Sequence, residues 1–295
     1  MKERSNTPLL VIGMAAIVIP LCCYLMVLSS LPDVWMKGSF DRYMGKKGII
    51  IPSVSSFKKY MNFLPGQDGY DYGSIFLKSG SIDFASFKDE DNWRKGFKFE
   101  TIGLSDIKDR LDNTGVWLDS LERYSYPLRT FVDKDMPMKE VLSVLYRIRP
   151  SRPSVAFVLR DRDTSGYIFF HYRIMDSIAT IEAYKSLPLH SVEVNKESDC
   201  FTVVWQKDLK WHDAKLTDVF EDMLSSRKAY VLAVDTRNMS FEDCISVVYE
   251  YVRIVHKYRN DYCLKTYGKP FEEGPLNITQ IREVKALFPQ NILVF

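Results

Sequence analysis

Hydrophobic residues follow three patterns along this chain, and the first is an unbroken apolar run at residues 9–31. The run has no charged residue and exceeds the roughly 20 residues that a helix needs to cross the hydrocarbon core of a bilayer. Lys2 and Arg4 precede it, so the positive-inside bias places the N-terminus in the cytoplasm. We expect an uncleaved, single-pass anchor with the rest of the chain outside the cytoplasm, and a cleaved signal peptide is the alternative.

The second pattern is a series of short apolar or alternating segments, which predicts β-strands. The pair at 74–84 is interrupted by Ser79 and Gly80, as in a hairpin. The run at 229–234 is almost wholly apolar and is expected to lie inside a sheet. The predicted strands span residues 74–84 (two strands), 97–102, 127–132, 154–159, 167–174, 200–205, 229–234 and 262–266, and residues 209–215 form either a short strand or an extended turn.

The third pattern is helical, with apolar residues recurring every three or four positions. It covers residues 138–148 and 241–258, where Ile245 lies at the centre of the apolar face and Glu250 on the opposite face. Thr217 is the expected cap of a helix at 218–224. Further helical segments are predicted from Ser105 to Leu111, at 116–124 and at 177–184.

Two of these strand–loop–helix segments match each other in sequence. Residues 132–146 align with residues 234–249 with one inserted loop residue, which predicts an internal duplication. Shared helical periodicity is the alternative source of the likeness. The duplication places Val132 and Val234 at equivalent buried positions. The aligned pairs include Met136/Met239, Leu142/Ile245, Ser143/Ser246, Val144/Val247 and Tyr146/Tyr249.

These patterns predict an α+β fold. An N-terminal single transmembrane helix is followed by two tandem modules, each with helices on one face of a small sheet. The expected divisions are the cytoplasmic N-terminus and membrane helix at 1–31, a juxtamembrane connector at 32–73, a first module at 74–185, a second module at 186–270 and a C-terminal extension at 271–295.

The second module resembles, over residues 192–269, the periplasmic domain of the ExbD/TolR family of biopolymer transport proteins. The likeness is carried by a strand, the turn Lys-Trp-His-Asp-Ala-Lys at 210–215, a helix opened by Leu-Thr-Asp, a strand that ends in Val234-Asp235, a helix and a last strand. The resemblance implies two tandem ExbD/TolR-like modules in a bacterial inner-membrane protein. The membrane helix of that family carries an aspartate that takes part in proton flow, and residues 9–31 contain none.

The resemblance implies a membrane-anchored periplasmic component of an ExbB/ExbD–TonB-like or Tol-like energy-transducing transport complex, without proton conduction of its own. Its expected partners are ExbB-like, further ExbD-like and TonB-like subunits in homo- or hetero-oligomers. The alternative is a membrane-anchored envelope protein that binds a ligand, senses or acts as a scaffold with the same fold. A third hypothesis is an extracytoplasmic enzyme whose site is assembled across the modules.

The amino-acid composition bears on which of these functions are possible. A hydrophobic content of 46% with 26% charged residues predicts a packed core, and a net charge of +2 gives no basic field for nucleic acid. Three cysteines lie outside the apolar run, namely Cys200, Cys244 and Cys263, and their spacing is not that of metal ligands. They form either one disulfide or three buried thiols.

Motifs of known catalytic chemistry are absent, including GxSxG, HExxH, a Walker loop and CxxC. The segment at 161–166 begins like a calcium loop, but its twelfth position is Tyr172, so we expect a hairpin turn. We predict a protein that is not an enzyme and has no catalytic, cofactor-binding or metal-binding residue. The acids Asp133/Asp135 and Asp161/Asp163 are interpreted as loop and turn residues, and His171, His190, His212 and His256 as structural or solvent-facing.

Overall fold

The fold is given by a computed structural model of the chain. Two compact units make up the chain, Met1–Gly48 with Phe87–Lys98 and Ile49–Ser86 with Phe99–Phe295. The predicted helices at 9–31, 116–124 and 177–184 lie outside the described residues. The structure describes residues 32–55, 73–87, 96–113, 127–164, 166–173, 190–197, 200–205, 209–211, 216–225, 230–271, 276–290 and 292–294.

The smaller unit contains helix α2 (Pro32–Lys47). Proline is well suited to the first position of a helix, because the N–H group that it lacks has no partner there in any case. Phe40 of α2 is buried, and its ring centroid lies 4.7 Å from that of Phe97. The predicted juxtamembrane connector therefore begins with a packed helix.

No described helix combines the length and the apolar composition that a membrane span requires. The longest, α8 (Phe241–Tyr267), carries Arg253, Lys257 and Arg259, and charged side chains are costly at membrane depth. This finding corrects the predictions of a transmembrane helix and of a single-pass inner-membrane protein. The segment at 9–31 on which those predictions rested is outside the described residues.

The first sheet has seven described strands in the order β1-β6-β5-β2-β3-β4, with β7 on the other side of β6. The pairs β2–β5, β5–β6 and β1–β6 are parallel, and β2–β3 and β6–β7 are antiparallel. The strand predictions at 74–84, 97–102, 127–132, 154–159 and 167–174 are confirmed. The bounds are β1 Ser53–Val54, β2 Ser74–Lys78, β3 Ser81–Phe87, β4 Phe97–Ile102, β5 Leu128–Val132, β6 Ser154–Asp161 and β7 Tyr167–Arg173.

The second sheet has five described strands in the order β10-β9-β8-β11-β12. β11 pairs in parallel with β8 on one side and with β12 on the other, so the apolar run at 229–234 is interior, as predicted. The pairs β8–β9 and β9–β10 are antiparallel. The bounds are β8 His190–Glu197, β9 Cys200–Trp205, β10 Leu209–Trp211, β11 Tyr230–Val234 and β12 Ile292–Val294.

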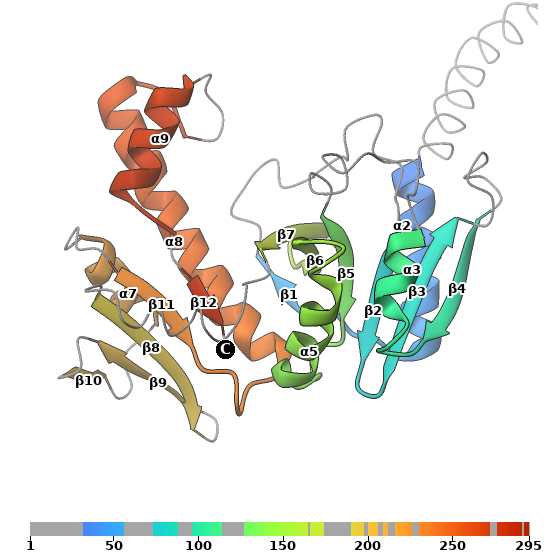
Figure 1. The fold of residues 1–295 in the computed structure, drawn as a ribbon. Coiled ribbons are helices and arrows are strands. Elements are labelled where there is room, and N and C mark those ends of the chain that lie inside the picture. The colour runs from blue at the N-terminus through green and yellow to red at the C-terminus, as the bar shows by residue number, and fades with distance from the viewer. Residues whose placement is uncertain are drawn as a thin grey trace, which may run out of the picture. The chain divides into compact units, whose positions relative to one another are not determined.

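Five strands of the first sheet, in the order β4-β3-β2-β5-β6, have the same topology as the second sheet, and β1 and β7 are additional (Figure 1). In each, three consecutive strands lie side by side, and a helix, a strand parallel to the first, another helix and another parallel strand follow. The helices are α3 (Ile107–Asn113) and α5 (Met138–Ile148) in the first repeat, and α7 (Leu216–Ser225) and α8 in the second. This common order supports the predicted duplication.

The predicted fold of a membrane helix followed by two ExbD/TolR-like modules is wrong for the described residues, which form two mixed sheets rich in parallel pairs. Strand pairing reaches beyond the segments that were expected to fold as modules. β1 comes from the predicted connector and pairs with β6. β12 comes from the predicted C-terminal extension and pairs with β11.

The predicted closing strand at 262–266 is also wrong, because α8 continues through it. Val255, Arg259 and Cys263 are buried at intervals of four residues, so one helical face stays covered to the end of the segment. The helix ends at Gly268, whose φ of 66° is left-handed and whose N–H donates to the Leu264 carbonyl at 3.1 Å. α9 (Ile278–Leu287) then lies beside the last turns of α8 (Figure 1), where the Tyr262 hydroxyl donates to Glu283 at 3.0 Å.

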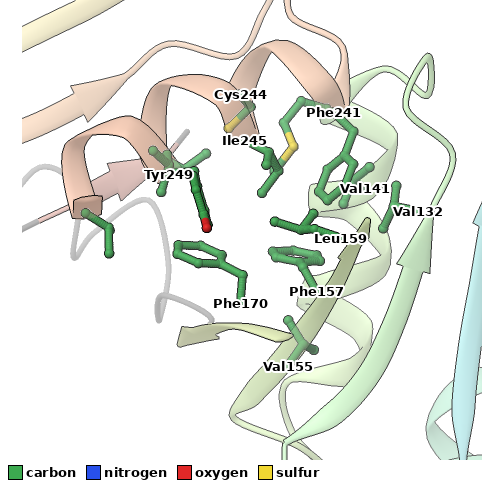
Figure 2. Packing of buried hydrophobic residues seen from close by; sticks show 14 of the residues in the cluster. Val132, Val141, Val155, Phe157, Leu159, Phe170, Phe241, Cys244, Ile245 and Tyr249 are labelled. Atoms are coloured by element: carbon green, nitrogen blue, oxygen red, sulfur yellow. The ribbon is translucent and has the colours of Figure 1, made fainter. Parts of the chain in front are cut away.

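The core lies between the first sheet and helices from both repeats. Figure 2 shows Phe157 and Phe170 pointing from the sheet toward Ile245 and Tyr249 of α8. The ring centroids of Phe157 and Phe241 are 5.0 Å apart, and those of Phe170 and Tyr249 are 6.1 Å apart. Val132 and Val234 are each fully buried, as the duplication predicted.

Candidate functional site

The face of the first sheet opposite to this core carries a row of aromatic rings. Side chains alternate along a strand, so Phe76 and Phe131 point away from the helices that cover Ile75 and Val132. The centroids of Phe76 and Phe131 are 4.5 Å apart and their rings are stacked. The row continues from Phe99 (5.8 Å from Phe76) to Tyr167 (5.7 Å from Phe131) and Phe169 (6.5 Å from Tyr167).

This row passes from buried to accessible rings. Phe76 and Phe131 are 0% and 1% exposed, whereas Tyr167 and Phe169 on β7 are half-buried and His171 on the same face is exposed. Among the described strands, β7 is the last on its side of the sheet. The accessible end of the row therefore coincides with an edge of the sheet.

Two arginines lie over the accessible rings. The Arg160 guanidinium is 4.9 Å from the centroid of Tyr167, and that of Arg129 is 5.5 Å from the centroid of Phe169. Such cation–π contacts contribute about 0.5–2 kcal/mol and hold a flexible side chain in one orientation. We call Arg129, Arg160, Tyr167, Phe169 and His171 the arginine–aromatic patch.

A buried carboxylate lies farther along the same face. Asp83 of β3 pairs in register with Phe76 and is 2% exposed. It accepts hydrogen bonds from the Thr101 hydroxyl at 2.5 Å and from the Ser81 hydroxyl at 3.5 Å. Hydroxyl groups of β3 itself and of the neighbouring β4 thus satisfy this side chain, several strands away from the patch.

The aspartates at the ends of parallel strands hold turns. Asp133 accepts the backbone N–H groups of Ile50 at 3.0 Å and Asp135 at 3.1 Å. Asp161 accepts the Asp163 N–H at 3.1 Å, and the hydroxyl of Thr164 also donates to it. The interpretation of the paired acids as loop and turn residues is confirmed.

The starts of α5 and α8 contact each other through their backbones. The Met138 N–H donates to the Met239 carbonyl at 2.9 Å, and the Phe241 N–H donates to the Met136 carbonyl at 2.8 Å. We call these two exchanged bonds the reciprocal junction. Free N–H groups at a helix start can bind an anion, but here other parts of the chain accept from Met138 of α5 and from Phe241 and Glu242 of α8.

The remaining candidate residues do not form a cluster. His256 is half-buried beside the Phe271 ring, whose centroid is 6.1 Å away, and the side chains of His190 and His212 lie outside the described residues. Within the described part of the chain, no group of three or more His, Cys, Asp or Glu side chains is placed to hold a metal ion.

The described cysteines are thiols. Cys244 and Cys263 are buried and free, and burial raises the pKa of the Cys244 thiol to about 12 and also raises the pKa of Cys263. A thiol with a raised pKa is a poor nucleophile at neutral pH, because the thiolate is the reactive form. Cys244 and Cys263 are therefore not joined by a disulfide. The Cys200 side chain lies outside the described residues.

Sequence reasoning missed the arginine–aromatic patch. Its signal is the alternation of Tyr167, Phe169 and His171 opposite the apolar residues of β7. The arginines come from two other strands, so recognising the patch also requires the strand order.

Comparison with known proteins assigns no family. No protein-family model matches the chain, and no curated protein matches it. A solved structure that matches is a Bacteroides thetaiotaomicron protein described as having an actin-like ATPase fold and unknown function, at 12% identity and a TM-score of 0.15. The match covers 76% of this chain and 90% of that one, and at this TM-score it carries no argument about fold or function.

Proposed function

We propose that this chain is a binding protein without catalytic activity, and that the arginine–aromatic patch is its surface for a protein partner. The observation that carries the proposal is the pair of half-buried rings, Tyr167 and Phe169, each beneath an arginine at a sheet edge. Tyrosine and arginine are enriched among the residues that dominate binding energy at protein interfaces. Arginines held in place over rings lose less side-chain freedom when a partner binds.

The contacts made at the carboxyl ends of the parallel strands also favour a protein without catalytic activity. α/β enzymes commonly place their reacting groups at the carboxyl ends of parallel strands. Here Asp133 and Asp161 accept hydrogen bonds within turns, and the reciprocal junction occupies the starts of α5 and α8. These contacts favour a structural role for the positions where catalysis would otherwise be expected.

The alternative drawn from the sequence is a membrane-anchored binding or scaffold protein. The proposal retains the binding role from that alternative and does not include the membrane anchor. The ExbD/TolR resemblance and the transport-complex function that it implies remain predictions that neither the structure nor the comparisons test. The proposal rests on the patch alone.

Affinity capture with the tagged full chain tests this proposal. We expect Arg129→Ala/Arg160→Ala to lose proteins that the wild type retains from a lysate of its source cells. Lys139→Ala/Arg147→Ala is the matched control, because it also removes two positive charges but from exposed positions on α5. Quantitative mass spectrometry would show the loss. Equal retention by the patch variant and the control would contradict the proposal.

A further inference from the structure

We propose that residues 49–55 form a strap that fixes the end of β6 from which Arg160 projects, and that docking of the strap and binding at the arginine–aromatic patch stabilise each other. This inference rests on the proposed function, because it assigns a regulation to the same site. The strap includes β1, and its backbone contacts β5, β6 and α8. The two states involved are the docked strap and the released strap.

The strap holds the end of β6 through hydrogen bonds to its own carbonyl groups. The Arg160 N–H donates to the Pro52 carbonyl at 2.8 Å, and the Arg162 N–H donates to the Val54 carbonyl at 2.9 Å. The Arg162 guanidinium also donates to the Ser53 carbonyl at 3.1 Å. Because these bonds fix the β6 backbone at Arg160, they also fix the direction in which the Arg160 side chain leaves the strand.

The strap also contacts β5 and the second repeat. The Ile50 N–H donates to the Asp133 carboxylate at 3.0 Å, and the Lys134 N–H donates to the Ile50 carbonyl at 2.7 Å. At the other end of the strap, the Ser55 carbonyl accepts the Tyr249 hydroxyl of α8 at 3.1 Å. One short segment therefore joins two strands of the first sheet to a helix of the second repeat.

From α8, further contacts lead back to the patch through β7. The rings of Tyr249 and Phe170 lie side by side, with centroids 6.1 Å apart (Figure 2). Phe170 is on the core face of β7, and Tyr167 of the same strand lies beneath the Arg160 guanidinium on the patch face. The strap, α8, β7 and β6 thus form a closed ring of contacts, in which displacing one member changes the contacts of the next.

The strap has the properties of a segment that can open locally. Its strand β1 has two residues, and the pairing with β6 covers only Arg160 and Asp161. Segments held by few hydrogen bonds open at a lower free energy than the core of a protein. Ile49, Ile51 and Val54 are buried, so the docked strap is the stable state of the chain and release is the minor one.

Release of the strap would loosen β6 at the patch. The N–H groups of Arg160 and Arg162 would lose their acceptors, and a fixed backbone would no longer hold the Arg160 side chain over Tyr167. A partner that contacts the ordered patch therefore binds the docked state more tightly. Because coupling between two sites is reciprocal, the same partner must stabilise the docked strap.

Amide hydrogen exchange of the full chain tests the link between the strap and α8. Tyr249→Phe removes the hydroxyl that donates to Ser55 and keeps the ring. We expect the amides that form the strap bonds to exchange about two- to tenfold faster, as the loss of one hydrogen bond predicts. These amides belong to Ile50, Lys134, Arg160 and Arg162.

Tyr251→Phe is the matched control on the same helix. Its hydroxyl also donates to a backbone carbonyl outside α8, that of Pro289 at 3.3 Å, but this carbonyl is not in the strap. The control should leave exchange of the strap amides at the wild-type rate. Equal acceleration by both variants would overturn the inference, because it would report a general loss of stability.

Two patch variants test the link in the opposite direction. Arg160→Ala removes the side chain over Tyr167, and we expect exchange of the strap amides to rise by a similar factor. Arg129→Ala also removes a patch arginine, but Arg129 lies near the opposite end of β5 from the strap, so exchange should stay unchanged. An equal rise with Arg129→Ala would overturn the route through Arg160.

Affinity capture with the same full-length variants measures the coupling to a partner. Tyr249→Phe should retain about two- to tenfold less of the proteins that Arg129→Ala/Arg160→Ala loses, whereas Tyr251→Phe should retain them as the wild type does. Undiminished capture by Tyr249→Phe, or unchanged strap exchange in both Tyr249→Phe and Arg160→Ala, overturns this inference and leaves the proposed function standing. Capture that does not depend on the two patch arginines overturns both.

Discussion

The two repeats have the same topology, but their equivalent helices begin differently. α8 begins after Ser240, whose hydroxyl accepts the Asp243 N–H while the Asp243 carboxylate accepts the Ser240 N–H, a complete capping box. α5 begins after Pro137, and no side chain caps it. Its start depends on the Met138 N–H that donates to Met239 in the other repeat. The start of α8 is therefore held by its own side-chain cap as well as by bonds from Phe241 and Glu242 to the first repeat, whereas α5 has no side-chain cap.

The equivalent aspartates differ in the same way. Asp133, after β5, accepts the N–H of Ile50, a residue more than eighty positions away in the chain. Asp235, after β11, accepts the N–H and the guanidinium of Arg237, two residues away. Both aspartates therefore hold the N–H group two residues on, and Asp133 in addition holds the distant N–H of Ile50.

The largest expected effect tests whether the two repeats have equivalent cores. Ile245→Ala and the aligned Leu142→Ala each remove a buried side chain, 3% and 8% exposed, and should each cost about 2–5 kcal/mol of unfolding free energy. Urea denaturation of the full chain measures both. Arg147→Ala, on the exposed side of α5, is the control and should change stability by less than about 0.5 kcal/mol. A negligible cost at Leu142 alone would show that the first core is not equivalent.

A smaller difference is expected at the strand-end aspartates. Asp133→Ala removes the acceptor of the Ile50 and Asp135 N–H groups, and each lost hydrogen bond should cost about 0.5–1.5 kcal/mol because both bonds are only partly buried. Asp235→Ala should lower the unfolding free energy by less. The Arg237 side chain is 84% exposed, so water can take the place of the lost carboxylate. Thermal melts at neutral pH compare the two. A larger loss for Asp235→Ala would show that the bond from Ile50 to Asp133 adds little stability.

The helix caps should give a still smaller effect. Ser240→Ala removes the capping box of α8 and should cost about 0.5–2 kcal/mol. Pro137→Ala removes no cap from α5, and its cost of about 0.4–1 kcal/mol or less comes from the greater freedom of the unfolded chain. Denaturation midpoints at unchanged slope would report both. A negligible cost for Ser240→Ala would mean that the capping box adds nothing to the start of α8.

The smallest predicted effect is a dependence on pH that belongs to the second repeat alone. Glu250, expected on the outer face of α8, instead accepts hydrogen bonds from Arg253 at 2.8 Å and from the Thr217 hydroxyl at 2.9 Å. The Arg253 hydrogen bond lowers the pKa of Glu250 from its usual value near 4.5, against the effect of burial. The aligned residue in the first repeat is Arg147, which is exposed.

A lowered pKa means that Glu250 contributes stability above its unfolded-state pKa and loses that contribution as the pH falls through the folded-state value. The wild type should therefore lose slightly more stability below about pH 4.5 than Glu250→Gln does, by less than about 1 kcal/mol because the group is partly exposed. Melts across that range measure the difference. Parallel pH profiles for the two proteins would contradict the role of Glu250.

Much of the secondary structure could be predicted from local sequence. The helix at 138–148 and the strands at 97–102 and 200–205 have the predicted bounds, because hydrophobic period and turn residues act over a few positions. The strand prediction at 262–266 is wrong, because five residues of mixed polarity are compatible with both the strand period and the helix period. Packing of this segment against α9 favours the helix. The likeness of 132–146 to 234–249 also pointed to the repeat before any strand order was known.

The sequence by itself determined the repeat, the buried valines Val132 and Val234 and the turn roles of Asp133 and Asp161, because each depends on residues close in the chain. Only the tertiary structure decided which strands are neighbours, and pairing between distant segments leaves no local period to read. That pairing joins β1 and β12 to the sheets and brings Arg129, Arg160 and Tyr167 from three strands to one face. The patch exists because the pleat directs alternate residues of paired strands to the same side.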